Sequence, residues 1–127
     1  MKLKYTILYV DNVAETLAFY EQAFSMKVAT LHESGDYGEL NTGTTSLSFS
    51  SLELMAQLGK GAVAPVAGSP CFEIAFETND VALALDKALA AGASLVQDVE
   101  EMPWGQTTAY VHDINGFLIE LCSPVRG

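Results

Sequence analysis

Near its N-terminus the chain reads Tyr5-Thr6-Ile7-Leu8-Tyr9-Val10-Asp11-Asn12-Val13-Ala14, and a related segment reads Glu73-Ile74-Ala75-Phe76-Glu77-Thr78-Asn79-Asp80-Val81-Ala82. The alignment continues without a gap through the pairs Leu17/Leu85, Ala23/Ala91 and Val28/Val96. Each copy has the pattern of a strand, an acidic or amide helix cap, a helix and a further strand. A unit too small to bury its own apolar face can bury it against a copy, so the repeat predicts two equivalent modules.

The first copy has clear local signals. Residues 3–10 alternate in the manner of a strand, and Asn12-x-x-Glu15 is a capping box. Behind it, apolar residues recur at helical spacing and predict a helix of about twelve residues. Extended segments are expected near 26–33, 36–41 and 45–50, with turn residues between them. The first module is therefore predicted to be β-α-β-β-β.

The second copy predicts the same order. Residues 51–70 contain several Gly and Pro residues, and the helical spacing there ends before Gly59. We expect one domain over residues 1–127, divided into a first module (1–57), a linker (58–70) and a second module (71–127). In the second module we expect a helix capped by Asn79 or Asp80 and ended by Gly92. Strands are expected near 94–97, 106–112 and 117–122, with Asn115-Gly116 supplying the positive φ angles of a two-residue hairpin loop.

The composition narrows the class of protein. Half of the 127 residues are apolar, which suffices for one core. The net charge of −10 repels phosphate backbones and anionic lipids, so neither nucleic acid nor a membrane is an expected partner. No apolar run approaches the roughly 20 residues that cross a bilayer, and no signal peptide is apparent, which predicts a cytoplasmic protein. Cys71 and Cys122 lie in apolar segments without C-x-x-C spacing and are predicted to be buried thiols.

The paired modules and two motifs resemble the vicinal oxygen chelate superfamily, which contains glyoxalase I, extradiol dioxygenases and the bleomycin and fosfomycin resistance proteins. The segment Leu8-Tyr9-Val10-Asp11-Asn12, with Phe19-Tyr20, is similar to the opening of that family's first module. The second motif is Met102-Pro103-Trp104-Gly105-Gln106 followed by Ala109-Tyr110-Val111-His112-Asp113-Ile114-Asn115-Gly116-Phe117-Leu118-Ile119-Glu120-Leu121. It resembles the family's ending, with Ile114-Asn115 where most members have Pro-Asp. The similarity is greatest to bleomycin-resistance-like members.

The resemblance implies an α+β fold in which two cup-shaped sheets face a shared cavity, often completed by a second subunit, so a homodimer is expected. Catalytic members hold a divalent metal with four inward side chains, typically His and Glu. Those positions are occupied here by Tyr5, Ser48, Glu73 and Glu120. A phenol and a hydroxyl are poor ligands for Zn²⁺, Ni²⁺ or Fe²⁺, and His32 and His112 lie elsewhere. No cofactor is therefore expected, with Glu73 and Glu120 as weak candidates for a loosely bound Mg²⁺ or Mn²⁺.

The remaining candidates concern ligand binding. Two carboxylates that share a cavity either attract a cation or raise one pKa; alternatively, both form structural hydrogen bonds. Trp104 is either a hinge packed on its own module or an aromatic wall of the pocket, and the tyrosines supply either ring faces or core packing. The predicted ligand-binding residues are Tyr5, Tyr9, Ser48, Glu73, Trp104, Tyr110 and Glu120.

Three functional hypotheses follow. The favoured one is a small-molecule-binding protein of the glyoxalase/bleomycin resistance type, which sequesters a cationic or aromatic drug or metabolite, as in antibiotic resistance, without a tightly bound metal. The second is a metal-dependent lyase or isomerase of the glyoxalase I (lactoylglutathione lyase) type. The third is a metal-free enzyme with Glu73 as the candidate general base. The sequence does not distinguish an enzyme from a binding protein, and it does not name the ligand.

Overall fold

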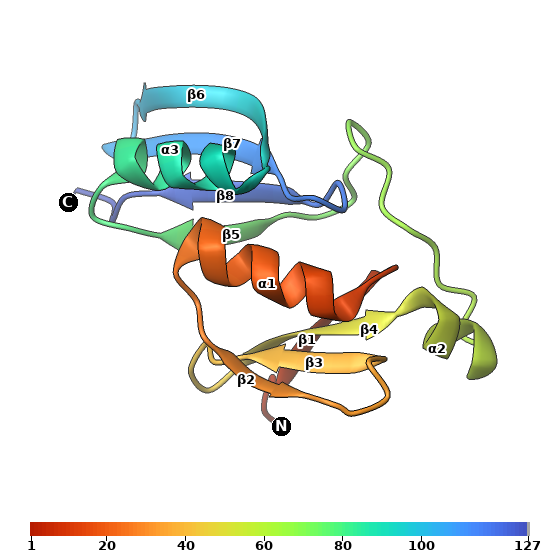
Figure 1. Ribbon diagram of the computed structural model, residues 1–127. Helices are drawn as coiled ribbons and strands as arrows, with labels where there is room; N and C mark the ends of the chain where they lie inside the picture. Colours follow the sequence, from red (N-terminus) through yellow and green to blue (C-terminus); the bar gives the residue numbers. More distant parts are fainter. Residues whose placement is uncertain (127) are drawn as a thin grey trace. The chain divides into compact units, whose positions relative to one another are not determined.

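The computed structural model describes residues 1–126, which form two units of the same design (Figure 1). The first unit covers Met1–Ala64, and the second begins at Pro65. The elements of the first unit are β1 (Tyr5–Val10), α1 (Val13–Phe24), β2 (Val28–Leu31), β3 (Tyr37–Leu40), β4 (Ser46–Ser51) and the short helix α2 (Leu52–Gln57). Those of the second are β5 (Ile74–Glu77), α3 (Val81–Ala91), β6 (Ser94–Met102), β7 (Gln106–His112) and β8 (Leu118–Cys122). The predicted α+β fold of two β-α-β-β-β modules is confirmed.

Each unit has one four-stranded mixed sheet. The strand orders are β1-β4-β3-β2 and β5-β8-β7-β6, so the first strand of each unit pairs with the last. That pairing is parallel, whereas the other pairs are antiparallel. A parallel pair cannot be closed by a tight turn and needs a long crossover, which here includes the long helix. One face of each sheet is therefore covered by α1 or by α3.

Helix α1 begins and ends as its sequence predicts. The Asn12 side-chain oxygen accepts a hydrogen bond of 2.9 Å from the Glu15 backbone N–H, and Ser25 ends the helix with a φ of 57°. The buried face of the helix includes Leu17 and Tyr20, and the Tyr20 ring lies 5.0 Å from the Phe49 ring of β4. Gly38 on β3 allows this close approach, because a Cβ there would lie 2.5 Å from Leu17 Cδ1.

Helix α3 repeats this arrangement in the second unit. Of the two candidate caps, Asp80 is the one used, since its Oδ1 accepts from the Leu83 N–H at 3.0 Å. Gly92 ends the helix with a φ of 116°, as predicted. Val81 and Leu85 are buried and occupy the same repeat positions as Val13 and Leu17 of α1. The repeat in the sequence is therefore a repeat of core packing. Among helices in the described residues, none has the length and apolar character needed to cross a bilayer.

Some local predictions were wrong. Strand β6 extends to Met102, well beyond the predicted end at residue 97. Its polar half has low intrinsic strand propensity but pairs with β7, as in Glu100↔Thr108, and its charges are tolerated because β6 is an edge strand. By contrast, the helical spacing before Gly59 corresponds to a real element, helix α2, which Ser51 caps. Cys71 is exposed, whereas Cys122 is buried as predicted.

The turn between β7 and β8 also differs from its prediction. Gly116 has a φ of 102°, but Asn115 does not have a positive φ. The turn is organised by Asp113, whose Oδ1 accepts hydrogen bonds of 2.9 Å from the backbone N–H groups of Asn115, Gly116 and Phe117. An aspartate side chain that accepts from nearby backbone groups replaces the two-residue hairpin loop. Asp113 is only 4% exposed, so these donors would lose a buried acceptor if it were removed.

We predict that Asp113→Ala destabilises the protein by about 2–3 kcal/mol, because buried backbone donors would be left without their acceptor. Asp113→Asn should cost clearly less, since an amide oxygen can still accept from the turn. Urea unfolding followed by circular dichroism measures both effects. The exposed Asp86→Ala on α3 is the matched control and should change the unfolding free energy by less than about 0.5 kcal/mol. Equal effects of Asp113→Ala and Asp86→Ala would contradict the role of the turn.

Candidate functional site

Side-chain alternation gives each sheet two different faces. In the second unit, Ile119 and Leu121 of β8 are buried on the face toward α3. Glu120 and Cys122 therefore point to the opposite face, beside Tyr110 and Thr108 of β7, with which they are paired. The alternation of side chains along the strands thus places titratable groups together on the face opposite α3, without the need for a special loop.

The main polar cluster of this face joins three of the residues predicted from the sequence. The Tyr110 hydroxyl lies 3.0 Å from Glu120 Oε2 and 3.3 Å from Glu73 Oε2. Tyr110 and Glu120 are direct cross-strand partners, and Glu73 immediately precedes β5, the strand paired with β8 on its other side. We call Glu73, Tyr110 and Glu120 the carboxylate–phenol centre.

The carboxylate–phenol centre has one hydrogen for two short oxygen–oxygen contacts. A phenol carries a single proton and can donate it fully to only one acceptor, and an ionised carboxylate only accepts. With both carboxylates ionised, one of the two short oxygen–oxygen contacts to Tyr110 has no hydrogen of its own. An incoming N–H donor with a positive charge would donate to the carboxylate that the phenol proton does not serve and would offset the negative charge. The centre is therefore suited to a cationic hydrogen-bond donor.

The environment keeps the neighbouring weak acids protonated. Burial, followed by the hydrogen bond to and the charge of Glu120, raises the pKa of Tyr110 above its ordinary value, with a smaller contribution from Glu73. Burial also raises the pKa of the Cys122 thiol, and the charges of Glu120, Glu77 and Glu73 raise it further. Tyr110 is thus a neutral donor and Cys122 an unreactive thiol at neutral pH, which leaves negative charge dominant on this face.

The corresponding face of the first unit contains the other predicted residues. Ser48 is completely buried in the centre of the sheet, paired with Ile7 of β1 and Glu39 of β3. Tyr9 is half-buried on the same face. Tyr5 is 45% exposed, and the Lys4 ammonium lies 5.6 Å from its ring centroid. All three lie on the face of the sheet opposite α1, and of the three only Tyr5 is well exposed.

Sequence reasoning missed two residues of this face. The Tyr37 hydroxyl donates a hydrogen bond of 2.9 Å to Glu39 Oε2. Both side chains are half-buried and flank Gly38, the glycine that packs against α1. The alternation Tyr37-Gly38-Glu39-Leu40, with small and apolar residues toward the helix, is the signal that would have revealed them.

Trp104 lies away from the carboxylate–phenol centre. It belongs to the turn between β6 and β7 and is 57% exposed, so it is not packed into the core. Its indole N–H donates to Gln106 Oε1 at 2.8 Å, and Gln106 in turn donates to the Ser123 carbonyl at 3.0 Å. Tyr110 follows Gln106 by four residues along β7, a strand distance of about 13 Å. Only an extended ligand could contact both Trp104 and Tyr110.

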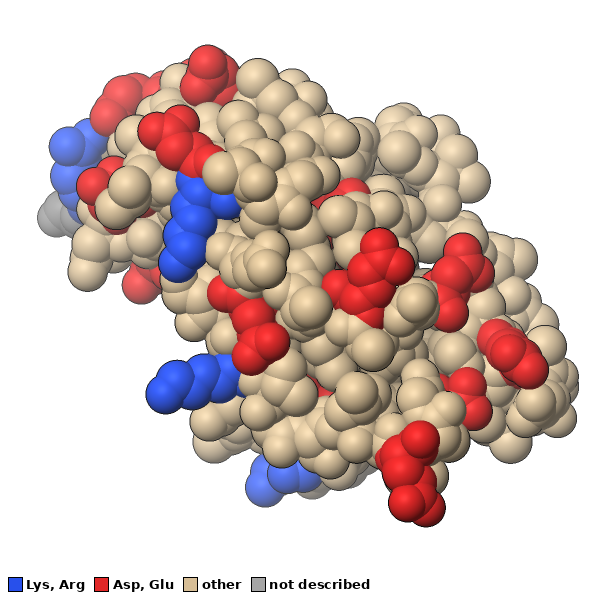
Figure 2. All heavy atoms as spheres, in the orientation of Figure 1, with Lys and Arg blue, Asp and Glu red and all other residues tan. Residues whose placement is uncertain are grey.

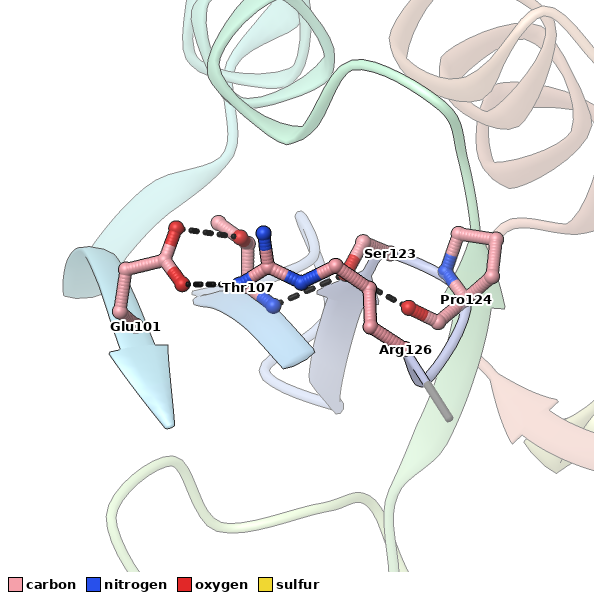
Figure 3. Close-up of polar contacts among 5 residues, drawn as sticks. All are labelled: Glu101, Thr107, Ser123, Pro124 and Arg126. Atoms are coloured by element: carbon pink, nitrogen blue, oxygen red, sulfur yellow. Dashed lines mark hydrogen bonds and ion pairs between the residues drawn. The ribbon is translucent and has the colours of Figure 1, made fainter. Parts of the chain in front are cut away.

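The C-terminal segment holds this end of the hairpin in place (Figure 3). Arg126 Nη2 pairs with Glu101 Oε2 at 2.9 Å, and Thr107 donates through its hydroxyl to the other Glu101 oxygen at 3.0 Å. The Thr107 backbone N–H donates to Ser123 Oγ at 2.9 Å. Because both side chains of the ion pair are largely exposed, it contributes at most about 1 kcal/mol, and the backbone-directed bonds matter more.

The residues do not fit a transition metal. The four positions that the resemblance assigns to metal ligands contain a phenol, a hydroxyl and two carboxylates, a set without imidazole. Across residues 1–126, no group of three or more His, Cys, Asp or Glu side chains is arranged to hold a metal ion. His32 is exposed and hydrogen-bonded to Ser34, and His112 lies at the end of β7, opposite Ser94 and Leu118.

Comparison with known proteins agrees with this architecture. A family model described as "Glyoxalase-like domain" matches residues 3–126. A glyoxalase/bleomycin resistance protein/dioxygenase family enzyme from Burkholderia phytofirmans PsJN is 21% identical, with a TM-score of 0.82 and coverage of 97% of this chain and 98% of that one. A glyoxalase-related enzyme from Fulvimarina pelagi is 18% identical, with a TM-score of 0.83 and coverage of 97% and 88%.

A third solved structure, TioX from Micromonospora sp. ML1, is 20% identical, with a TM-score of 0.74 and coverage of 97% of this chain and 98% of that one. No curated protein matches this chain. At these identities the structural matches show the fold, whereas the family is shown by the domain model.

We predict that Glu120→Gln lowers the pKa of Tyr110 toward its ordinary value of 10.0, because the charge that opposes phenolate formation is removed while burial remains. Tyrosine-specific ¹³C NMR titration, with Tyr110→Phe identifying the signal, measures the shift. In the wild type, stability should fall as the pH rises above about 10, since the unfolded chain then releases a proton that folded Tyr110 retains. Tyr110→Phe should remove that part of the pH dependence. A Tyr110 pKa that is unchanged by Glu120→Gln would contradict the assigned geometry.

Proposed function

Because the chain belongs to the glyoxalase-like domain family, within the vicinal oxygen chelate superfamily, we propose that it binds a small organic cation with an aromatic or otherwise apolar part. The observation that supports this most is the carboxylate–phenol centre, where Tyr110 has one proton for contacts to two carboxylates. A protonated amine supplies both the missing hydrogen and the opposite charge. The proposed role is sequestration of a drug or metabolite, as in antibiotic resistance.

The surface charge favours the same class of ligand. The chain has 16 acidic and 6 basic residues, and Figure 2 shows acidic side chains spread over the visible face, with few basic ones among them. A negative surface raises the local concentration of cationic ligands and their association rate. The free thiols of Cys71 and Cys122 fit a reducing compartment and hence the proposed cytoplasmic location.

A lyase or isomerase of the glyoxalase I type receives less support from the site. Such an enzyme would need a metal with several strong ligands, and the four family positions supply only Glu73 and Glu120 as carboxylates. Glu73 as a metal-free general base is also disfavoured, because the residue is exposed and water competes for its carboxylate. No observation favours either enzyme over binding.

The two carboxylates should contribute unequally to binding. Two unit charges about 4 Å apart interact by roughly 1 kcal/mol in water and by roughly 4 kcal/mol at an effective dielectric constant near 20. Glu120 is half-buried and makes the shorter hydrogen bond to Tyr110, whereas Glu73 is exposed. Glu120 therefore provides the stronger anchor.

We predict that aromatic amines found in a thermal-shift screen lose at least about tenfold in affinity with Glu120→Gln and less with Glu73→Gln. Both changes keep the side-chain shape while removing a charge. Isothermal titration calorimetry at constant ionic strength measures the affinities. Glu77→Gln, an exposed carboxylate on the same strand face, is the matched control and should have a small effect. A screen that yields only anionic or neutral ligands, bound equally well by Glu120→Gln, would exclude this function.

We predict that incubation with a chelator leaves the melting temperature unchanged and that elemental analysis finds no stoichiometric Zn, Ni or Fe. The donor set lacks imidazole, so a structural contribution from such a metal is not expected. Near one metal per chain, lost together with stability in Glu120→Gln, would instead support the glyoxalase I-like enzyme.

We also predict a homodimer. Tyr5 and Ile7 are 45% and 41% exposed on β1, which is an edge strand of its sheet. Apolar side chains beside unpaired strand edges are typical of surfaces that associate with a further copy. Sedimentation at micromolar concentration should give twice the monomer mass of 13.6 kDa, and Ile7→Glu should shift the equilibrium toward monomer. A monomer at all concentrations would disprove this assembly.

A further inference from the structure

We propose that the turn between β2 and β3 is a proton-sensitive clasp on helix α2, in which His32 senses the proton and Asp36 holds the helix. The clasp consists of His32, Ser34, Asp36 and Ser51, which successive hydrogen bonds join from the surface of the turn to α2. It lies within the first unit and shares no residue with the carboxylate–phenol centre, so it is independent of the function proposed above.

The inner half of the clasp is a double contact between Asp36 and Ser51. The Ser51 hydroxyl donates to Asp36 Oδ1 at 2.7 Å, and the Ser51 backbone N–H donates to the Asp36 carbonyl at 2.8 Å. The same hydroxyl accepts from the Leu54 backbone N–H in α2 at 3.0 Å. Because Ser51 is buried, water cannot readily replace the aspartate as its partner. The orientation of the capping hydroxyl therefore depends on the position of the Asp36 carboxylate.

The outer half of the clasp is shaped by an imidazole nitrogen without a proton. The Ser34 backbone N–H donates to His32 Nδ1 at 3.1 Å, and the Ser34 hydroxyl lies 2.8 Å from the same nitrogen. A backbone N–H can only donate, so Nδ1 is an acceptor in this arrangement. The Ser34 hydroxyl therefore donates to Nδ1, and it accepts from the Asp36 backbone N–H at 3.2 Å.

Protonation of His32 reverses this pattern. A proton on Nδ1 faces the Ser34 N–H with another donor, and the Ser34 hydroxyl must change from donor to acceptor. The turn then loses the bonds by which it closes on the imidazole. Both residues are exposed, so their groups can bond to water instead and the unit need not unfold.

The protonated imidazole also competes with Ser51 for Asp36. An imidazolium N–H bonds a carboxylate more strongly than a neutral hydroxyl does, because both partners are charged. Asp36 belongs to the same turn, and its backbone N–H is held by the hydroxyl that contacts His32. A move of the carboxylate toward the imidazolium deprives the buried Ser51 hydroxyl of its acceptor. The cap of α2 thus depends on the protonation state of His32.

The surroundings of the turn contain no other histidine. The charged or titratable residues of the turn, of its flanking segments and of the helices packed on the same sheet are Lys27, Glu33, Asp36, Tyr37, Glu39, Glu53, Glu15, Tyr20 and Glu21. They are carboxylates, phenols and an ammonium, which are side-chain types that ordinarily change charge outside the range of about pH 5 to 8. A transition of α2 within that range is therefore assigned to His32.

NMR spectroscopy of the ¹⁵N-labelled full chain tests the proposal. At about pH 8, long-range ¹H–¹⁵N spectra should show Nδ1 of His32 as the nitrogen without a proton. As the pH falls to about 5.5, the amide signals of Asp36 and Leu54 should shift with the same midpoint as the His32 imidazole. The hydrogen-exchange rate of the Leu54 amide, divided by that of Leu83, should rise at least about twofold. Leu83 is the matched reference because its N–H has the corresponding side-chain cap on α3.

Two variants and a control separate the clasp from a general effect of pH. His32→Gln should abolish the change at Leu54, whereas His112→Gln, at the histidine of the second unit, should leave it intact. Asp36→Asn keeps an acceptor for Ser51 but removes the charge that attracts the imidazolium. It should abolish the change at Leu54 while His32 still titrates.

A change at Leu54 that persists in His32→Gln or in Asp36→Asn would overturn the proposal. So would a wild-type chain in which the His32 imidazole titrates while the Leu54 amide stays fixed. Neither variant alters the carboxylate–phenol centre, so ligand binding there can fail or succeed without affecting this test.

Discussion

The parallel pairing of the first and last strand within each unit is the constraint on which the rest of the structure depends. Strands β1 and β4, and likewise β5 and β8, can pair in parallel only if the chain crosses back over the sheet, and α1 and α3 provide part of that crossover. The helix then covers one face, which must be apolar. Because strand side chains alternate, polar residues at the intervening positions all lie on the other face. A polar face opposite the helix thus follows from chain connectivity.

On that face the two units place different chemistry in the same row. Ile7, Ser48 and Glu39 lie side by side in the first unit, and Ala75, Glu120 and Tyr110 lie side by side in the second. The row in each unit contains one carboxylate that accepts a hydrogen bond from a phenol. In the first unit Tyr37 donates to Glu39, and in the second unit Tyr110 donates to Glu120. The two units therefore share a backbone arrangement but differ in the negative charge beside the phenol, since in the second unit Glu73 also contacts Tyr110.

The features that sequence reasoning predicted are those with local causes. Caps and apolar periodicity specify α1 and α3, and alternation specifies β1, because each signal lies within the element that it describes. The end of β6 depends on pairing with β7, and the turn at Asp113 depends on the reach of one side chain, so neither could be read from propensity. Glu39 was missed for a related reason, because its position beside the buried Ser48 is set by the register between β3 and β4.

The predictions of site residues also succeeded where the cause is local and failed where it depends on strand pairing. Alternation placed Glu73 and Glu120 on one face, but their shared contact with Tyr110 depends on three strands in register. Trp104 was grouped with them by motif, whereas the structure puts it at the far end of β7. The ligand that we propose must therefore bind at the centre without Trp104, and because Glu73 is exposed, charge attraction there is weak in water. A simple ammonium ion would gain little, so useful affinity needs an apolar part that excludes water from Glu120 and Tyr110. An aromatic amine combines that part with the proton that the centre lacks.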